Sequence, residues 1–264
     1  MRIDLSSAPG DPERPNEDWL SASVPTSGEG GVLVALDGVT PPRGDVGCGH
    51  GVPWFASRLG GRLTELSGSR PDMPLDRILA EAIRATADAH RDTCDLSHAR
   101  TPQATVVVVR WDAEYVEHLV LSDSVLLLRA PEGEVTAVLD DRLDRVPPEV
   151  LRSVAATDAL RNADVAGAFF TAAADPAVAA RAVTGRVPRA RVAALAVLTD
   201  GASRWTDTFR EGDWADCMAV LRKEGAEALI GRVRTLESAA GDGRTPRSKR
   251  SKRHDDASAA YAEL

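Results

Sequence analysis

The sequence has few of the features that would place it outside the soluble globular proteins. None of its apolar runs approaches the roughly 20 residues that a membrane-spanning helix needs, and no apolar segment of the signal-peptide type follows the first methionine. Only three cysteines are present, Cys48, Cys94 and Cys217. Their odd number and wide spacing give neither a disulfide framework nor a zinc-binding pattern, so we expect a reducing, cytoplasmic environment.

The sequence also lacks an excess of basic residues. Its formal net charge is −8 and its isoelectric point is about 5.2, which argues against a general nucleic-acid-binding protein. Hydrophobic residues make up 43% and charged residues 27% of the chain, as in ordinary soluble domains. We therefore expect one domain over residues 1–264 with a substantial core, while the composition leaves the oligomeric state open.

The order of the apolar patterns predicts an α+β fold. Helices are predicted over residues 52–66, 75–96 and 214–240. The second helix would bury Cys94 on an apolar face, and the third would have a break near Gly225. Residues 140–190 form an alanine-rich variable region, and residues 241–254 form a basic loop. Strands are predicted over residues 19–24, 31–36, 104–111, 115–122, 125–129, 134–138, 191–199 and 257–264. Consecutive strands that are separated from the helices favour antiparallel sheets over a repeating βαβ unit.

Acidic residues stand at the ends of several predicted strands. Asp37-Gly38 and Asp200-Gly201 each follow an apolar run, and Asp255-Asp256 precedes the last strand. A single Asp-Gly pair is more often a plain turn, but several carboxylates that converge on one point repel one another and need a cation. Because no histidine or cysteine accompanies them, their oxygen atoms favour Mg²⁺ or Mn²⁺ over zinc.

The ordered set of acidic motifs resembles that of the metal-dependent Ser/Thr protein phosphatases of the 2C type. The resemblance covers nearly the whole chain, and its specificity lies in the order of the motifs, since each one alone is weak. The matching segments are Asn16-Glu17-Asp18, Leu36-Asp37-Gly38, Ala104-Thr105, Leu121-Ser122-Asp123-Ser124, Leu198-Thr199-Asp200-Gly201 and Asp255-Asp256-Ala257-Ser258. The fold that this resemblance implies is a four-layer αββα sandwich, in which two antiparallel sheets pack face to face between helices.

The resemblance also implies a site with two Mg²⁺ or Mn²⁺ ions. Asp37 would bridge the ions, Gly38 would offer its backbone carbonyl, and Asp200 would complete the shell of the first ion together with Asp256 or, in another alignment, Asp255. Asp37 and Asp200 would thereby act in catalysis through a metal-bound water. Glu17 would hold metal-bound water, and Asp18 would support the shell.

Two further residues are weaker candidates for the same site. Asp123 could bind a third ion together with Asp200, although a polar turn explains it equally well. Arg14 lies close to the place of a phosphate-binding arginine in the family, where a guanidinium could hold phosphate through two bonds, although a solvated arginine is an equal alternative. The basic stretch of residues 244–254 could attract phosphorylated substrates, but a solvated loop is the favoured interpretation.

Three departures from the family pattern bear on catalysis. Val39 stands where many members have a histidine that can act as general acid, Val125 replaces the arginine of a Gly-Asp-Ser-Arg turn, and Arg204 stands where an acid is frequent. His50 could substitute for the missing histidine, although a surface-loop histidine is favoured. A haloacid-dehalogenase-type phosphatase is disfavoured, because its nucleophile would fall on Ala35.

Two functional hypotheses follow from the motifs and from these departures. The first is metal-dependent hydrolysis of phosphoserine and phosphothreonine in phosphorylated protein substrates. The second is a catalytically weak or inactive phosphatase-like domain that serves as a protein-binding regulatory module.

Overall fold

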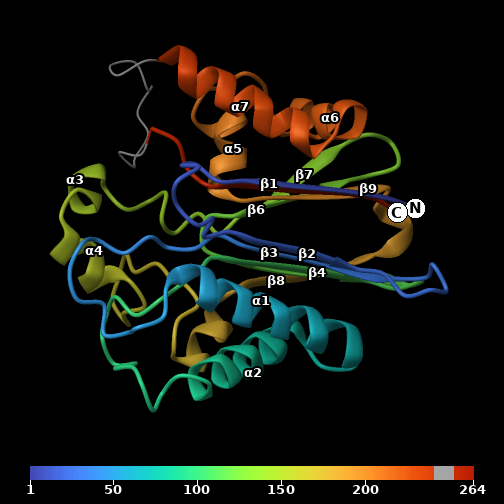
Figure 1. Cartoon of the computed structure of the whole chain (residues 1–264). Helices are drawn as coiled ribbons and strands as arrows, with labels where there is room; N and C mark the ends of the chain where they lie inside the picture. Colours follow the sequence, from blue (N-terminus) through green and yellow to red (C-terminus); the bar gives the residue numbers. More distant parts are fainter. Residues whose placement is uncertain (241–252) are drawn as a thin grey trace.

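Two antiparallel five-stranded sheets lie face to face in the computed structural model, which describes residues 1–240 and 253–264, and helices cover the outer side of each sheet (Figure 1). The strand order of the first sheet is β1 (Arg2–Ala8), β10 (Ala257–Glu263), β9 (Ala194–Leu198), β6 (Val125–Arg129) and β7 (Val135–Val138). The strand order of the second sheet is β2 (Trp19–Ser23), β3 (Gly31–Leu36), β4 (Val106–Trp111), β5 (Tyr115–Leu121) and β8 (Val183–Pro188). The four-layer αββα architecture predicted from the sequence is confirmed.

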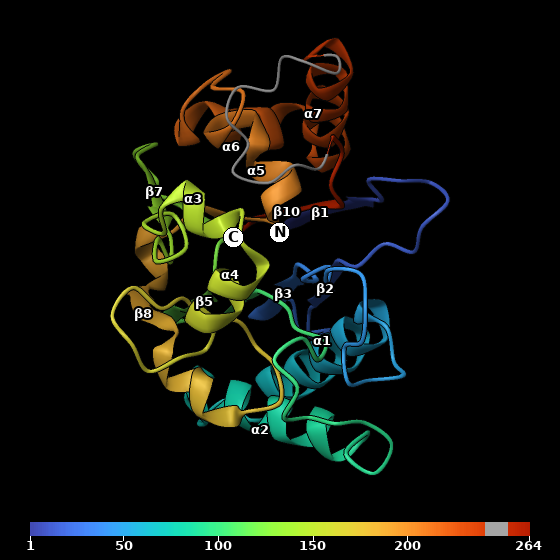
Figure 2. The same ribbon diagram turned by 90° about the vertical axis from the view of Figure 1, so that its left-hand side faces the viewer.

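The helices fall into two outer layers and one end group. Against the second sheet pack α1 (Val52–Ser69) and α2 (Leu75–Asp88), and against the first sheet pack α5 (Asp200–Asp207), α6 (Trp214–Glu224) and α7 (Ala226–Ala240). The region of residues 140–190 holds α3 (Pro148–Leu151), α4 (Val154–Leu160) and a 3-10 helix, η1 (Pro176–Arg181), and a further 3-10 turn, η2 (Arg189–Arg191), precedes β9. Figure 2 shows that α3 and α4 lie at one end of the sandwich.

Side-chain alternation along the strands separates the apolar core into layers. On β3, Val34 and Leu36 pack toward α1 and α2, whereas Leu33 and Ala35 pack toward the other sheet. This alternation follows from the two-residue repeat of a strand, and all four side chains are fully buried. Burial of a Val or Leu side chain stabilises a fold by about 1.5–3 kcal/mol, so a central strand buried on both faces fixes its position firmly.

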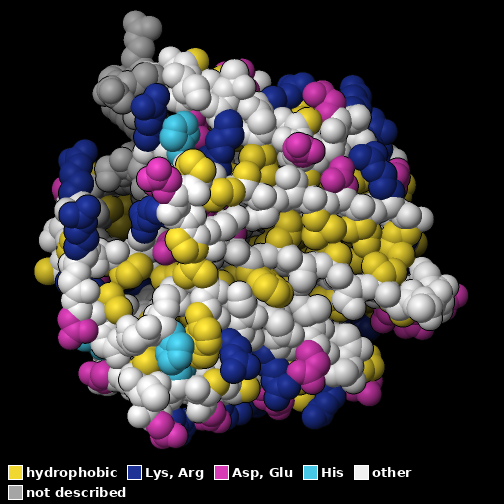
Figure 3. Space-filling model, viewed as in Figure 1, with side chains coloured by type: hydrophobic (Ala, Val, Ile, Leu, Met, Phe, Trp, Pro, Cys, Tyr) yellow, Lys and Arg dark blue, Asp and Glu magenta, His cyan; other side chains and the backbone are white. Residues whose placement is uncertain are grey.

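Two strands were missing from the sequence-based prediction. Strand β1 reads Arg-Ile-Asp-Leu-Ser-Ser-Ala and β8 reads Val-Thr-Gly-Arg-Val-Pro, and both are edge strands whose residues are exposed or half-buried. Edge strands need fewer apolar residues, so their pattern is weak. Between the edge strands β1 and β2 the surface carries a band of hydrophobic side chains along the line between the sheets (Figure 3), and Leu5 on β1 is 41% exposed.

The predicted helix over residues 75–96 is too long. Helix α2 ends at Asp88, because the next turns are closed by tighter hydrogen bonds from His90 to Ala87 and from Thr93 to His90. Cys94 therefore lies in a half-buried turn, and the prediction of a buried helical position was wrong.

Other sequence predictions were confirmed or lie outside the described residues. The predicted break near Gly225 is confirmed, since Gly225 separates α6 from α7 with a φ of 92°. The basic loop 241–254 lies outside the described residues apart from 253–254. Among the helices that are described, none is both long and apolar enough to cross a membrane.

Candidate metal centre

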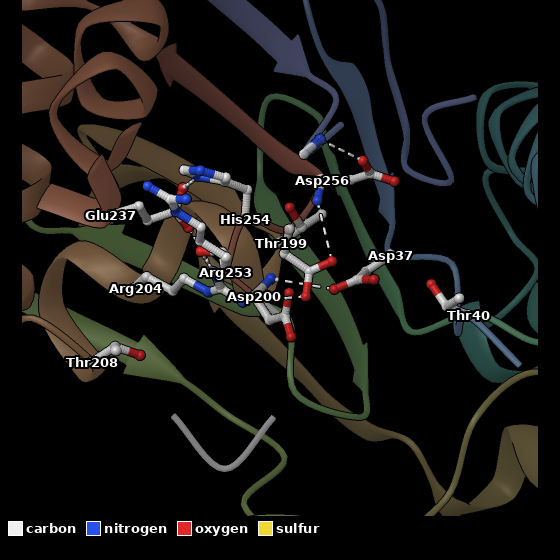
Figure 4. Close-up of polar contacts among 12 residues, drawn as sticks. Asp37, Thr40, Thr199, Asp200, Arg204, Thr208, Glu237, Arg253, His254 and Asp256 are labelled. Atoms are coloured by element: carbon white, nitrogen blue, oxygen red, sulfur yellow. Dashed lines mark hydrogen bonds and ion pairs between the residues drawn. The ribbon is translucent and has the colours of Figure 1, made fainter. Parts of the chain in front are cut away.

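Strand register brings the acidic segments together at one end of the sandwich. In the second sheet Trp19 pairs with Leu36, so the residues before β2 lie beside those after β3. In the first sheet Ala259 pairs with Leu198, so the residues before β10 lie beside those after β9. Four segments thus meet where the two sheets end, and Figure 4 shows Asp37, Asp200 and Asp256, which come from three of them, close together.

Asp37 lies at the centre of this acidic cluster. Its backbone N–H donates to Thr105 Oγ1 at 3.1 Å, and its Oδ2 accepts a bond from the backbone N–H of Asp200 at 3.4 Å (Figure 4). Burial raises the pKa of Asp37 well above its usual range, and the charges of Asp200 and Asp18 raise it further. The ionised form of this side chain is therefore costly unless positive charge is nearby.

Asp18 is the second acidic side chain with a strongly altered titration. Burial is the main cause that raises its pKa to about 8; the charges of Asp200 and Asp256 add to it, and hydrogen bonds from Ser258 and Thr199 oppose it. Its Oδ2 accepts a bond from Thr199 Oγ1 at 2.9 Å, while its Oδ1 is buried with no hydrogen-bond partner in the structure. A buried carboxylate oxygen without a donor is an atom that a cation would satisfy.

The two members of the final acidic pair have different surroundings. Both carboxylate oxygens of Asp256 accept backbone N–H bonds at 2.7 Å, one from Gly10 and one from Glu17. Asp256 therefore clamps the segment before β2 to the start of β10. The side chain of Glu17 in turn accepts a hydrogen bond from Thr40 Oγ1.

Asp255 instead faces a buried arginine. Its Oδ2 lies 3.3 Å from Arg204 Nη2, and Arg204 Nη1 lies 2.5 Å from Glu237 Oε1 on α7. His254 Nδ1 also contacts Glu237, at 2.7 Å (Figure 4). Arg204, which the sequence analysis noted as a departure from an acidic position, thus supplies an internal cation beside one candidate metal ligand.

A cavity of about 450 Å³ opens beside the acidic cluster. Asp37, Gly38, Asp123 and Asp255 line one part of it, and residues of α3, α4 and the adjoining turns line the rest. Arg14 lines a smaller hollow of about 40 Å³, together with Glu17, Asp255 and Asp256. Asp123 and Arg14 therefore both lie near the cluster, and the variable region 140–190 forms a wall of the cavity.

Both Asp-Gly pairs have a packing reason for their glycine. A Cβ atom on Gly38 would lie 2.5 Å from the carbonyl oxygen of Glu17, and a Cβ atom on Gly201 would lie 2.0 Å from the carbonyl oxygen of Asp256. These distances are far below van der Waals contact, so only glycine lets the other acidic segment approach. The glycines therefore serve to bring four carboxylate-bearing segments together, and not merely to form turns.

Sequence reasoning missed three contacts around this site and misplaced one residue. Thr105 Oγ1 accepts a hydrogen bond from the backbone of Asp37, and Thr199 Oγ1 donates one to Asp18. Both threonines belong to the matching motifs, but neither of them was given a role. Arg204 was noted from the sequence only because an acid is frequent at its position, and its contacts with Asp255 and Glu237 were not predicted. His50 is not among the residues that line the cavity and is not a plain surface histidine, because its ring stacks on Trp54 at 4.1 Å.

The donor set fits a hard divalent cation. Carboxylate, hydroxyl and backbone oxygen atoms converge on the cluster, and these are the ligands that Mg²⁺ and Mn²⁺ prefer. The unpartnered Oδ1 of Asp18 and the raised pKa values of Asp18 and Asp37 suit a site that binds a cation. The geometry thus defines a candidate site for divalent metal ions.

Comparison with known proteins agrees with this class. The family model described as protein phosphatase 2C matches residues 12–233, so the chain belongs to the protein phosphatase 2C family. Membership of this family supports a protein phosphatase function. A search among curated proteins finds no match.

Solved structures of bacterial phosphatases share the fold. Serine/threonine phosphatase Stp1 from Staphylococcus aureus is 12% identical, with a TM-score of 0.60 over 100% of this chain and 95% of the other. Serine/threonine phosphatase PstP/Ppp from Mycobacterium tuberculosis is 16% identical, with a TM-score of 0.62 over 100% of this chain and 98% of the other. The catalytic domain of PstP in complex with two manganese ions is 17% identical, with a TM-score of 0.59 over 99% and 97%. At these identities the likeness shows a common fold.

Proposed function

We propose that the protein hydrolyses phosphoserine and phosphothreonine in proteins with the help of two Mg²⁺ or Mn²⁺ ions. The observation that carries this proposal is the convergence of Asp18, Asp37, Asp200 and Asp255 on one end of the sandwich, beside an open cavity. Membership of the protein phosphatase 2C family supports it, as does a neighbour of the same fold that holds two manganese ions.

The residues take distinct roles in this proposal. The charges of the other acidic side chains act on Asp37, so Asp37 would be the ligand shared by both ions, next to the backbone carbonyl of Gly38. Asp200 and Asp255 complete the first shell, because Asp255 lines the cavity and its charge acts on Asp37. We favour Asp255 over Asp256 as a ligand, since backbone N–H groups already engage both carboxylate oxygens of Asp256.

Held by these carboxylates, two such ions would supply a water molecule of lowered pKa as the nucleophile, so that no phosphoenzyme would be needed. Glu17 and Asp18 orient the donors around this position, with Asp18 held by Thr199 and Glu17 held by Thr40. A third, weaker ion at Asp123 remains a prediction, supported by the place of Asp123 in the cavity wall and by its charge acting on Asp37.

Arginine side chains near the site supply positive charge for a phosphorylated substrate. Arg152, in the region of α3 and α4, is exposed and lines the large cavity, and Arg14 lines the adjoining hollow. A guanidinium binds phosphate through paired hydrogen bonds. We propose that these two arginines hold the phosphoryl group or its flanking peptide while the carboxylate cluster holds the ions.

The test is release of phosphate from a phosphothreonine peptide in the presence of Mn²⁺. We expect turnover by the purified protein and a loss of about 1,000-fold or more, equivalent to about 4 kcal/mol, in Asp37→Asn. The matched control is Asp164→Asn, because the Asp164 side chain is 93% exposed. If wild type and Asp37→Asn release phosphate equally slowly with Mn²⁺ and with Mg²⁺, the catalytic proposal is wrong.

A second candidate function is phosphopeptide binding without turnover. Two observations favour it: Val39 cannot donate a proton, and Arg204 already neutralises part of Asp255 at 3.3 Å. Calorimetric titration with Mn²⁺ and with the phosphopeptide separates the candidates. Tight phosphopeptide binding without phosphate release supports the binding module, whereas phosphate release supports the phosphatase.

A further inference from the structure

A second cluster of potential metal ligands lies away from the acidic site. It joins the loop before α1, which carries Cys48 and His50, to the turns after α2, which carry His90 and Cys94. One ligand atom from each of these four residues lies within 4.8 Å of every other. None of the four lines the cavity beside Asp37.

The distances within this cluster approach those of a tetrahedral site. Cys48 Sγ lies 3.4 Å from His90 Nδ1 and 3.7 Å from His50 Nδ1, and Cys94 Sγ lies 3.4 Å from His50 Nδ1. Zinc bonds of about 2.3 Å to sulfur and about 2.0 Å to nitrogen place ligand atoms at tetrahedral corners roughly 3.3–3.8 Å apart. All three sulfur–nitrogen distances fall within this range.

The distance between the two sulfur atoms does not by itself decide between a disulfide and a metal site, but the imidazoles do. They lie 2.9 Å apart, whereas a disulfide bond is about 2.05 Å long and two sulfur ligands of zinc are about 3.8 Å apart. Either outcome requires the sulfur atoms to move by about 1 Å. A disulfide gives no reason for two imidazole nitrogens to point at the same sulfur pair, but a metal ion does.

We propose that Cys48, His50, His90 and Cys94 bind one structural zinc ion. Binding removes one proton from each of the two thiols, so that two thiolates balance the charge of Zn²⁺ while both imidazoles stay neutral. The four protein ligands close the coordination shell and leave no open position for substrate. Sulfur and imidazole ligands select zinc over the Mg²⁺ or Mn²⁺ that suits the carboxylates.

The surroundings hold these ligands in place. The ring of Trp54 stacks on His50 with centroids 4.1 Å apart and lies 5.1 Å from the ring of His90. His90 is 3% exposed and its Nε2 has no hydrogen-bond partner in the structure, so the polar contacts of this ring lie on its Nδ1 side. The backbone N–H of His50 also donates to Cys48 Sγ at 3.4 Å, as amides commonly do toward a metal-bound sulfur.

The zinc ion would connect two loop segments that are joined by few other interactions. Residues 41–51 and 89–98 contain neither helix nor strand. One backbone bond, from Asp95 N–H to the carbonyl of Gly47, crosses between them at 2.6 Å. The loop begins beside Thr40, which contacts Glu17 at the acidic site. The ion would therefore fix the far end of a loop whose near end belongs to the proposed active site.

The first test is metal content after purification without chelators. We expect about one zinc per chain in the wild type and at least a tenfold loss in Cys48→Ser and Cys94→Ser. The matched control is Cys217→Ala, which removes the third thiol from the buried face of α6 and should keep its zinc. Zinc that survives both serine substitutions would overturn the proposal, because it would then lie elsewhere, for example at the carboxylates.

The second test uses the wild-type protein and so does not depend on folding of the variants. Replacement of the metal by Co²⁺ should produce the intense visible bands of tetrahedral coordination and near-ultraviolet absorption from thiolate-to-cobalt charge transfer. Absence of the thiolate band, or a mass lower by two hydrogens that shows a Cys48–Cys94 disulfide in the protein as purified, would overturn the proposal. Neither test involves phosphatase activity, so the result is independent of the proposed function.

Discussion

Removal of the negative charge of Asp18 should stabilise the metal-free protein and weaken its response to metal. Burial raises the pKa of Asp18 from 3.8 to about 8. Between these two values the folded protein holds a proton that the unfolded chain has released, so the free energy of unfolding of the metal-free protein falls as the pH rises. Asp37, whose pKa is also raised by burial, acts in the same direction.

The size of the effect follows from the shift of the pKa. At about 1.4 kcal/mol for each pKa unit, the burial of Asp18 costs about 4 kcal/mol at pH 7. Relaxation of the site reduces this figure, and we expect Asp18→Asn to raise the free energy of unfolding by about 2–4 kcal/mol. In a domain of this size that corresponds to a rise in Tm of about 4–8 °C. Asparagine retains an oxygen that can accept the bond from Thr199.

The assay is thermal unfolding of metal-free protein between pH 5 and pH 8, without and with Mn²⁺. Without metal, the advantage of Asp18→Asn over the wild type should grow with pH. With saturating Mn²⁺ at pH 8 the order should reverse, because binding to the folded state stabilises the wild type more. The control Asp164→Asn should follow the wild type in both series. The reasoning fails if metal-free Asp18→Asn is less stable than the wild type at pH 8.

Two further substitutions test the packing and the assignment of ligands. Gly201→Ala places a Cβ atom 2.0 Å from the carbonyl oxygen of Asp256. It should lower the free energy of unfolding, measured in urea, by about 2–3 kcal/mol. The control is Gly61→Ala in α1, whose added Cβ meets nothing within 4 Å and should not lower this free energy. Asp256→Asn should lower the free energy of unfolding by about 1–3 kcal/mol, because one hydrogen bond from a backbone N–H is lost. Asp255→Asn should mainly weaken Mn²⁺ binding, measured by calorimetry. Equal losses of Mn²⁺ affinity in the two variants would contradict the assignment of Asp255 as the metal ligand.

The central strands could be predicted because they are buried on both faces, while their arrangement as a sandwich followed from the resemblance to the 2C-type phosphatases. A run such as that of β3, which is apolar at every position after its glycine, has few other places to lie. The edge strands β1 and β8 could not be predicted in the same way, because each mixes polar and small residues and gains its stability from one neighbouring strand. Burial on both faces therefore makes the central strands predictable, whereas of the four edge strands β2 and β7 were predicted and β1 and β8 were not.

The acidic site was predictable for a related reason. Asp37 is the first residue after β3, and Asp200 is the second residue after β9. The predicted strands therefore also located both carboxylates. The choice between Asp255 and Asp256 could not be made from the sequence, because it depends on which side chain meets the backbone of Gly10 and Glu17. Arg204 likewise needed the packing of α5 against α7 before its partners could be named.

The cysteine–histidine cluster shows what sequence spacing leaves out. Cys48-x-His50 and His90-x-x-x-Cys94 are two short pairs separated by a helical hairpin, and neither pair alone has a zinc-binding spacing. They meet because α1 and α2 pack side by side and return the chain to the start of α1. The spacing of the cysteines along the sequence therefore gives no sign of this cluster, because the helical hairpin brings the two pairs together only in the fold.

The loop of residues 39–51 connects the two proposed metal sites. Its first residues line the cavity and reach Glu17 through Thr40, and its last residues carry Cys48 and His50. The two sites require ligands of opposite character, hard oxygen at one end and soft sulfur and imidazole at the other, so each can hold its own ion in the presence of both metals. Loss of zinc should therefore loosen the rim of the cavity without removing a single carboxylate, and would weaken substrate positioning more than Mn²⁺ binding.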